Sequence, residues 1–494
     1  MRPVNCCRLS LRNVFSPSIQ LSDWMFPHSR LARVTLPCVM PDHCSTMNRH
    51  RPMSIAAALG AALDRRETTA TRLTATSLDL SHRYASDAAM ISLTENLALR
   101  QAAASDRRRE LGHPRGPLDG VPIAWKDVFD VRGTVTTSGS AAHADDLPAV
   151  NDSYLVRKAH RRGLITLGKT NLSEFAFSGL GINTYFGTPA NPFDGSLVPG
   201  GSSSGSAVAV ARGIVPFSVG TDTSGSVRVP AAYCGIVGFR VSAGRYGPHD
   251  FAPLSRTLDS IGTLAKTVTD VIALDRALGP SVFRYQAGIP TFVIPAGEWS
   301  EDTTPEVGAD FAAVVDALRA DGAKVVIRDL RSIAAAQTLT DRFGTIVGAE
   351  AYQLHHHRLD SCMPLEDATR RRLLDNAGTR ASIGAVYAEM PALRIAFAEE
   401  LAGATLLCPT VRHLPPTIGE LRADAGRYDA ANASTLRTTM VLSLLGTCGI
   451  TLPAPAVAGR PPAGALLSRP CQEDDILLQH AAWSERAVYK AHSM

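Results

Sequence analysis

The sequence predicts an α/β fold built around a mixed β-sheet, and three observations support this prediction. Helix and strand signals alternate along the chain from residue 121 onward. The clearest unit is a helix over 311–319, a turn at 321–322 and a strand over 325–327. The composition, with 45% hydrophobic and 19% charged residues, is typical of a soluble globular protein, and 494 residues suffice for a large core.

The first elements are expected to be helical, over residues 53–110. Ile55, Leu59 and Leu63 recur at fourfold spacing, as expected for one face of a helix. Three arginines at 107–109 are expected at a helix C-terminus, where basic side chains complement the helix dipole. A turn at 116–120 then precedes a short apolar segment that ends at Lys126.

The following elements alternate between helix and strand. A helix is expected to end at Arg162, with a strand over 164–167 and the start of another helix over 172–177. The small apolar residues 207–211 predict a further helix, which Ser202, Ser203 or Ser204 could cap. Residues 340–440 are expected to be mainly helical and to shape a pocket.

The first 52 residues differ from the rest of the chain. They hold only two acidic residues, Asp23 and Asp42, but four of the nine cysteines, and they show no clear periodicity. A transit peptide would account for this composition, and so would an over-extended start before Met47 or Met53. We expect residues 1–52 to be a poorly ordered extension and residues 53–494 to form a single domain.

Composition and charge argue against several classes of partner. A net charge of +4, from 50 Lys and Arg against 46 Asp and Glu, is too small to indicate a nucleic-acid-binding protein. The uncharged stretch 438–459 is interrupted by glycines and prolines, so it is expected to be buried core and no membrane partner is predicted. Nine scattered cysteines indicate reduced thiols and a cytoplasmic location.

A run of three histidines, 355–357, could suggest a metal site. Consecutive residues face different directions in a helix or a strand, so three in a row do not form a ligand set by themselves. We expect these side chains to be exposed or to line a pocket, and we predict no metal and no organic cofactor.

Residues 199–226 carry the strongest functional signal. Two clusters rich in serine and glycine flank a short apolar stretch in this segment. A flexible linker is the usual origin of such clusters. Here apolar segments bracket them closely, which favours a loop where backbone must approach another group, as at a nucleophile and its oxyanion pocket.

Lys126 stands out among the lysines because it ends an apolar segment. Most lysines are solvated. Burial disfavours the charged ammonium and lowers the pKa of a lysine, which suits a neutral amine acting as a general base.

Four ordered motifs resemble the amidase signature family. Residues 120–127 read G-V-P-I-A-W-K-D and residues 168–175 read G-K-T-N-L-S-E-F. Residues 200–206 read G-G-S-S-S-G-S, and residues 220–230 read G-T-D-T-S-G-S-V-R-V-P. The resemblance is most specific over residues 121–240 and looser from residue 55 to the C-terminus. Ser204 and Ser224 depart from it, because glycine is frequent at both positions.

The resemblance implies a fold and a set of catalytic residues. The fold would be a mixed twisted sheet covered on both faces by helices, with a signature core over residues 120–240. Ser226 would be the nucleophile, Ser202 a bridging serine in a cis peptide, and Lys126 the base. The family's oxyanion hole corresponds to the backbone amides of Thr223, Ser224, Gly225 and Ser226, with Ser203, Asp222 and Arg228 in supporting roles.

The function that follows is hydrolysis of a linear carboxylic amide to an acid and an amine or ammonia, through an acyl-enzyme on Ser226. A small-molecule amide is the expected partner, and the sequence is compatible with a homodimer. Phe175, Phe177, Tyr185 and Tyr233 are candidate pocket walls.

Three other interpretations compete with this one. Residues 201–205 satisfy G-x-S-x-G, the α/β-hydrolase nucleophile motif, but the prolines and glycine in 191–200 argue against the strand that this motif needs. The A subunit of a glutamyl-tRNA(Gln) amidotransferase commonly reads S-I-R-Q-P after the nucleophile, whereas residues 226–230 here read S-V-R-V-P. A non-catalytic binding protein would be expected to have lost at least one of Lys126, Ser202 and Ser226.

Overall fold

A computed structural model describes residues 54–280, 283, 288–360 and 363–493. The predicted extension, residues 1–52, lies outside the described residues. None of the helices that the structure describes combines the length and apolar character that a bilayer span requires.

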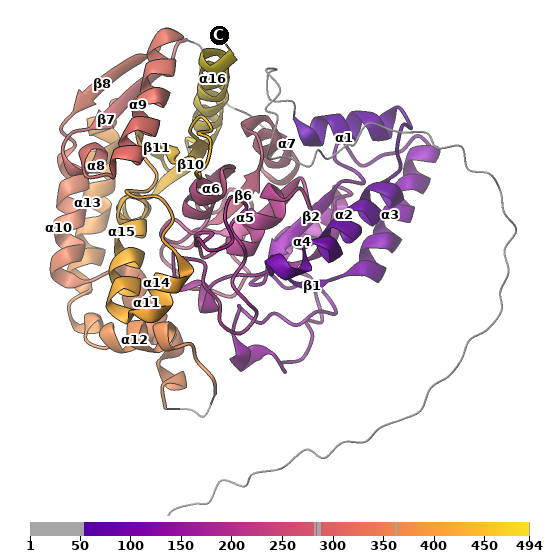
Figure 1. The fold of residues 1–494 in the computed structure, drawn as a ribbon, viewed down its shortest axis with the longest axis horizontal. Helices are drawn as coiled ribbons and strands as arrows, with labels where there is room; N and C mark the ends of the chain where they lie inside the picture. Colours follow the sequence, from indigo (N-terminus) through magenta and orange to yellow (C-terminus); the bar gives the residue numbers. More distant parts are fainter. Residues whose placement is uncertain (1–53, 281–282, 284–287, 361–362, 494) are drawn as a thin grey trace, which may run out of the picture. The chain divides into compact units, whose positions relative to one another are not determined.

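The centre of the described chain is one mixed sheet of 11 strands, in the order β1-β3-β2-β4-β6-β5-β10-β11-β9-β7-β8 (Figure 1). Strand β2 pairs in parallel with both β3 and β4, and β7 pairs in parallel with β8 and β9. The other neighbours are antiparallel. The strands are β1 Met90–Leu93, β2 Pro122–Lys126, β3 Ile165–Thr170, β4 Phe217–Thr221, β5 Val237–Arg240, β6 Ile261–Ala265, β7 Thr291–Pro295, β8 Lys324–Arg328, β9 Thr405–Pro409, β10 Thr447–Pro453 and β11 Gly464–Pro470.

Helices pack against this sheet along its length, and β7 and β8 at one end lie beside α8 and α9 (Figure 1). The helices are α1 Ile55–Asp64, α2 Ala70–Arg83, α3 Glu95–Glu110, α4 Tyr154–Arg161, α5 Ser204–Ala211, α6 Arg228–Cys234, α7 Val268–Leu278, α8 Glu298–Glu301, α9 Pro305–Ala320, α10 Arg331–Phe343, α11 Ile346–His355, α12 Asp367–Asp375, α13 Gly384–Leu401, α14 Ile418–Ala423, α15 Ala425–Leu444 and α16 Asp474–Ser493.

Helices cover both faces of the sheet. The alternation of side chains along a strand shows this, since neighbouring residues point to opposite faces. In β2, Ile123 and Trp125 join the apolar cluster that contains α7 and α16, whereas Ala124 joins the cluster formed by α5 and α6. The predicted fold class, a mixed sheet flanked by helices, is confirmed.

Two local predictions differ from the structure. Residues 90–93 form strand β1, although the whole of 53–110 was expected to be helical. Residues 172–177 do not begin an α-helix: they contain only the short 3₁₀ turn η3 (Glu174–Ala176), in which Phe175 has a φ of 49°. The amide of Phe175 donates to the Ser138 carbonyl oxygen at 2.8 Å, and this long-range bond replaces a helical one.

Candidate active site

Lys126 lies at the end of strand β2 and is completely buried. Its Nζ lies within hydrogen-bonding distance of two hydroxyl groups, 2.7 Å from Ser202 Oγ and 2.8 Å from Thr221 Oγ1. Burial lowers the pKa of Lys126 to about 7, although the Asp259 and Asp222 carboxylates act in the opposite direction. In the described part of the chain no carboxylate forms an ion pair with this amine.

A second buried lysine, Lys169, has a different environment. Its Nζ lies 2.6 Å from Asp127 Oδ1, and both side chains are fully buried. It also donates to Thr136 Oγ1 at 3.0 Å. Of these two motif lysines, Lys169 is neutralised by an acid, whereas Lys126 contacts hydroxyl groups.

Ser202 approaches Lys126 from the loop that precedes α5. The peptide bond between Gly201 and Ser202 is cis, at the position where the resemblance implies one. A Cβ on Gly201 would lie 2.6 Å from the backbone nitrogen of Gly181, so the loop packing leaves no room for a side chain there. The Ser202 carbonyl oxygen accepts a hydrogen bond from the Ser173 amide at 3.3 Å.

Ser226 and Ser203 are joined through their backbones. The Ser203 amide donates to the Ser226 carbonyl oxygen at 3.0 Å, and Ser203 Oγ donates to the Thr221 carbonyl oxygen at 3.3 Å. The Ser226 side chain is 4% exposed, and its Oγ makes no hydrogen bond to any residue that the structure describes. The segment of Ser226 is therefore fixed beside that of Ser202, while its hydroxyl is not engaged.

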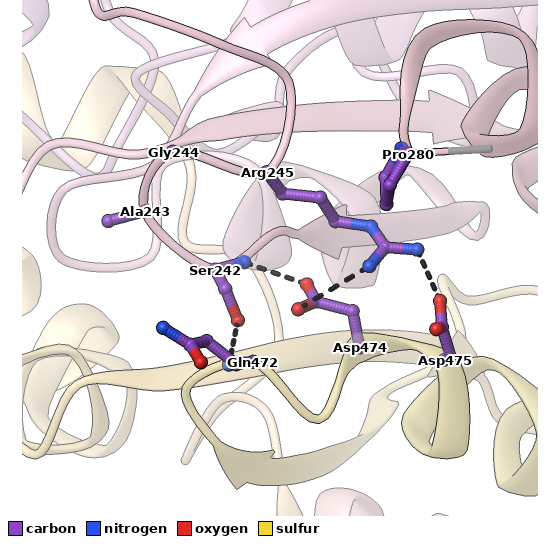
Figure 2. Close-up of a pocket in the computed structure, with 8 residues that line it drawn as sticks. All are labelled: Ser242, Ala243, Gly244, Arg245, Pro280, Gln472, Asp474 and Asp475. Atoms are coloured by element: carbon purple, nitrogen blue, oxygen red, sulfur yellow. Dashed lines mark hydrogen bonds and ion pairs between the residues drawn. The ribbon is translucent and has the colours of Figure 1, made fainter. Parts of the chain in front are cut away.

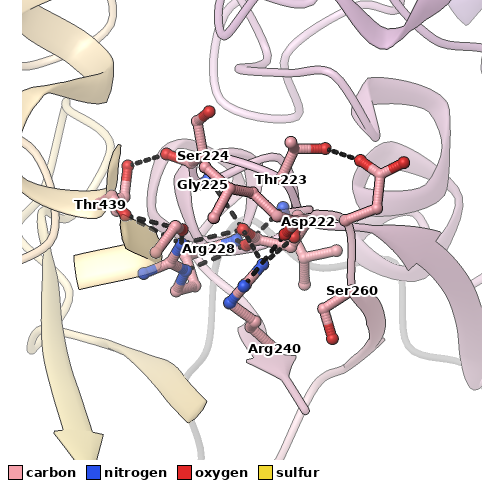
Figure 3. Close-up of polar contacts among 12 residues, drawn as sticks. Asp222, Thr223, Ser224, Gly225, Arg228, Arg240, Ser260 and Thr439 are labelled. Atoms are coloured by element: carbon pink, nitrogen blue, oxygen red, sulfur yellow. Dashed lines mark hydrogen bonds and ion pairs between the residues drawn. The ribbon is translucent and has the colours of Figure 1, made fainter. Parts of the chain in front are cut away.

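The loop 222–226 is organised around the Asp222 carboxylate (Figure 3). Asp222 Oδ1 accepts from the Gly225 amide at 2.8 Å, and Oδ2 accepts from the Val227 amide at 3.1 Å. Arg228 forms a two-point contact with the same carboxylate, at 3.0 Å and 2.8 Å. Asp222 and Arg228 thus connect the loop to the first turn of α6.

This arrangement narrows the set of backbone donors at the predicted oxyanion hole. The Gly225 amide is occupied by Asp222. The amides of Thr223, Ser224 and Ser226 have no hydrogen-bond acceptor among the described residues. Three of the four predicted donors remain free for a ligand oxygen.

Electrostatics keep Asp222 ionised. Burial alone would raise the pKa of this carboxyl, but the Arg228 guanidinium, and then Arg240, outweigh burial and hold the pKa well below its usual range. Arg240 also donates to the Asp222 carbonyl oxygen and, at 3.1 Å, to the Leu258 carbonyl oxygen. A charged Asp222 therefore acts as a fixed acceptor for the loop amides.

Sequence reasoning missed several residues that hold this loop. Thr439 donates from its Oγ1 to the Ser224 carbonyl oxygen at 2.5 Å (Figure 3). Asp259 Oδ1 accepts from Thr223 Oγ1 at 2.6 Å, and burial raises the pKa of Asp259 to about 6. Thr221 lies inside the motif at 220–230, and Arg240 ends the region of specific resemblance, so both could have been found there. Thr439 and Asp259 are distant in sequence and gave no signal.

A cavity of about 190 Å³, here called the Phe175 cavity, adjoins the segments described above. Of the predicted pocket walls it contains Phe175, while Tyr185 is 55% exposed and Phe177 and Tyr233 are buried elsewhere. The cavity is lined by Val128, Ser138, His143, Phe175, Ala252, Pro253, Leu354, His355 and Arg358, three of which belong to the predicted pocket-shaping region 340–440.

A different set of residues lines a cavity of about 440 Å³, which includes Ser242 and Gln472 (Figure 2). Its Arg245 lies 2.7 Å from Asp275 and 2.5 Å from Asp475, so acids already neutralise its charge. No predicted site residue lines this cavity, and we assign it no catalytic role. No group of three or more His, Cys, Asp or Glu side chains in the described ranges is placed to hold a metal ion.

The amidase family's sequence profile matches residues 72–477. The 2-amino-5-chloromuconic acid deaminase of Comamonas testosteroni is 31% identical over 80% of this chain and 87% of its own length. The A subunit of the glutamyl-tRNA(Gln) amidotransferase of Coxiella burnetii is 44% identical, but over only 38% of each chain.

Solved structures give a similar result. A crystal structure of an amidase superimposes with a TM-score of 0.78 at 30% identity, covering 87% of this chain and 99% of that one. The peptide amidase of Stenotrophomonas maltophilia has a TM-score of 0.71 at 26% identity, covering 88% and 96%.

Proposed function

Because the chain belongs to the amidase family, whose members hydrolyse C–N bonds, we propose that Lys126, Ser202 and Ser226 cleave a linear carboxylic amide through an acyl-enzyme. The observation that carries this proposal is the contact between a fully buried, unpaired lysine and Ser202, at 2.7 Å. A serine hydroxyl is a weak nucleophile unless a base takes its proton.

Lys126 is the base in this proposal. At neutral pH a large share of the amine is uncharged, since its pKa is about 7. A neutral amine has one lone pair, which accepts the Ser202 hydroxyl proton. Its two N–H groups can donate to Thr221 Oγ1 at 2.8 Å and to the Thr221 carbonyl oxygen at 3.5 Å.

The first half-reaction forms the acyl-enzyme. Ser226 Oγ attacks the amide carbonyl carbon, its proton passes to Ser202 Oγ, and the Ser202 proton passes to Lys126. The free amides of Thr223, Ser224 and Ser226 stabilise the negative oxygen that develops, as is usual for acyl transfer. The C–N bond then breaks, and the nitrogen leaves with the proton returned from Lys126 through Ser202.

The second half-reaction releases the acid. Water attacks the ester on Ser226, its proton follows the same route to Lys126, and collapse of the intermediate returns a proton to Ser226 Oγ. Atoms and charges balance with water as the only co-substrate. Asp222, Arg228 and Ser203 support the loops that present these groups and do not exchange protons.

The test is hydrolysis of a panel of short aliphatic and aryl amides by the full chain, with Ser226→Ala as the control variant. Loss of a catalytic serine is expected to lower kcat by about 10⁴-fold or more. Intact-mass measurement after acid quench should reveal an added acyl group, which Ser226→Ala should lack. Release of acid and amine at an undiminished rate by Ser226→Ala would rule the mechanism out.

The amidotransferase A subunit is the second candidate, supported by 44% identity over 188 residues. Val229 stands where that branch commonly has glutamine, and the deaminase relative aligns over a much larger share of this chain, 80% against 38%. We therefore propose an enzyme that acts without a partner chain. Amide hydrolysis by the purified chain alone distinguishes the two functions.

A further inference from the structure

Several segments that line the Phe175 cavity are connected through the backbone to the residues of the proposed triad. Val128 follows Lys126 by two residues, and its amide donates to the Lys126 carbonyl oxygen at 2.7 Å. Phe175 follows Ser173 by two residues, and the Ser173 amide donates to the Ser202 carbonyl oxygen.

A third lining segment is connected through Asp259 to the loop 222–226, which carries the proposed oxyanion donors. Pro253 precedes Leu254, whose amide donates at 3.0 Å to Asp259, the acceptor for Thr223. The cavity is therefore built on segments that also carry or hold the residues of the proposed mechanism.

Cationic and imidazole groups gather around one aromatic ring in this cavity. His355 stacks on Phe175 with ring centroids 4.3 Å apart and an interplanar angle of 21°. The His143 ring meets Phe175 edge-on at 5.9 Å, and the Arg358 guanidinium lies 5.1 Å from the Phe175 ring centroid. The residues described as lining the cavity include no Asp or Glu.

A hydrogen-bond chain orients Arg358. Its Nη2 donates to His143 Nε2 at 2.9 Å, and His143 Nδ1 lies 2.5 Å from Asp146 Oδ2. An arginine can only donate, so His143 Nε2 must carry a lone pair and Nδ1 must carry the proton that Asp146 accepts. His143 thus links Arg358 to Asp146 and fixes the orientation of the guanidinium.

His355 has unsatisfied polar atoms. Both of its ring nitrogens are buried and lack a hydrogen-bond partner among the described residues. Burial, aided by Arg358, lowers the pKa of His355 to about 3, so the ring is neutral and offers one N–H donor. Buried polar atoms in folded proteins nearly always have partners, and an orphaned pair at a cavity wall points to a ligand.

We propose that the Phe175 cavity binds a carboxylate on the substrate, with Arg358 as its positive partner and His355 as a hydrogen-bond donor. Resting on the proposed function, this makes the preferred substrates short amides that also carry a carboxylate, such as monoamides of dicarboxylic acids. Phe175 serves as the platform that holds both groups.

Binding can be tested without catalysis. Calorimetric titration of the full chain compares succinate with 1-butanol, which has a similar length but no carboxylate. An oriented charge pair away from bulk water contributes about 30-fold or more in affinity, so succinate should bind more tightly by that factor. Arg358→Met should remove this preference and leave butanol binding within about twofold.

Two further variants keep the result interpretable. His355→Phe preserves stacking on Phe175 but lacks the N–H, and should weaken succinate binding about fivefold. Arg331→Met is the matched control, because Arg331 is 89% exposed on α10, and it should leave both affinities unchanged. If Arg358→Met does not fold, as judged by its melting temperature, His355→Phe still decides. Equal wild-type affinities for succinate and butanol, or equal losses for both in either cavity variant, would overturn the proposal.

A kinetic arm separates this proposal from the proposed function. Succinamate should be hydrolysed with a kcat/KM about 30-fold or more above that of butyramide, and Arg358→Met should equalise them. Hydrolysis of both amides at equal rates would reject the carboxylate site and leave the amidase proposal standing. If neither amide is cleaved by wild type, the amidase proposal fails for this substrate class, while the titrations still decide what the cavity binds.

Discussion

Thr223 donates its hydroxyl to Asp259 at 2.6 Å, which places a buried carboxylate beside the loop that carries the free backbone amides. The same carboxylate acts electrostatically on Lys126 and favours its charged form. Asp259 thus connects two parts of the proposed mechanism that are otherwise separate, the oxyanion donors and the base.

Asp259→Asn is expected to move the pH dependence of hydrolysis. Loss of the negative charge removes an influence that raises the pKa of Lys126, so the acid limb of the kcat/KM profile should shift to lower pH. The weaker hydrogen bond from Thr223 Oγ1 to the neutral side chain should lower kcat about fivefold. Steady-state rates between pH 5 and 9 measure both effects. The surface carboxylate Asp194 gives the control, and a limb that moves equally in Asp194→Asn would contradict this role for Asp259.

For the wild-type enzyme, kcat/KM should rise about tenfold for each pH unit below pH 7 and become constant above pH 7. The reason is that only neutral Lys126 can accept a proton, and its pKa is about 7. Lys126→Met should lose activity at every pH. A profile that stays flat from pH 5 to 8 would remove Lys126 from the role of base.

Lys126→Met is also expected to stabilise the fold at pH 7. Between pH 7 and 10.5 Lys126 is protonated in the unfolded chain but mostly neutral in the folded one. The free energy of unfolding therefore falls as the pH is lowered through that window. At pH 7 the deficit is about 5 kcal/mol, and losing two hydrogen bonds offsets about 2 kcal/mol. Urea unfolding should thus show a gain of about 3 kcal/mol at pH 7. At pH 10 the deficit is only about 1 kcal/mol, so the lost hydrogen bonds outweigh it and the variant should be about 1 kcal/mol less stable than wild type. A loss of stability at pH 7 would argue that the amine is charged in the folded state.

Asp222→Asn should destabilise the protein and slow the reaction. It leaves the guanidinium groups of Arg228 and Arg240 buried without their carboxylate, which costs about 3–5 kcal/mol. Urea denaturation gives the stability change and amide hydrolysis the rate. Asp424→Asn breaks an exposed pair with Arg427 and should change stability by less than about 0.5 kcal/mol. Comparable losses in both variants would be inconsistent with a structural role for the buried carboxylate.

Gly225→Ala tests the shape of the oxyanion loop. Gly225 has a φ of 132°, and a Cβ there would collide with Thr439 Oγ1. We expect kcat to fall at least about tenfold, since small displacements of catalytic groups are costly. Gly403→Ala is the control, because Gly403 has a φ of 80° but nothing within 4 Å of an added Cβ. It should lose about 1 kcal/mol of stability and no activity.

The local sequence pattern was sufficient to predict the elements next to Lys126 and Ser202, two residues of the proposed triad. The apolar run ending at Lys126 is strand β2, and the small residues after Ser203 form α5. The 3₁₀ turn at Phe175 could not be read in this way, because its bond to Ser138 joins residues 37 positions apart. Asp259 was missed for the same reason, since its partner Thr223 is 36 residues away.

The hydrogen bond from Thr439 to the Ser224 carbonyl oxygen joins residues 215 positions apart. A shortened polypeptide that kept every signature motif but stopped before α15 would therefore lack the residue that holds the loop 222–226. During synthesis from the N-terminus, the proposed nucleophile, Ser226, emerges long before Thr439, which holds the Ser224 carbonyl oxygen. Nascent chains should consequently remain chemically inert until most of the sequence has been translated.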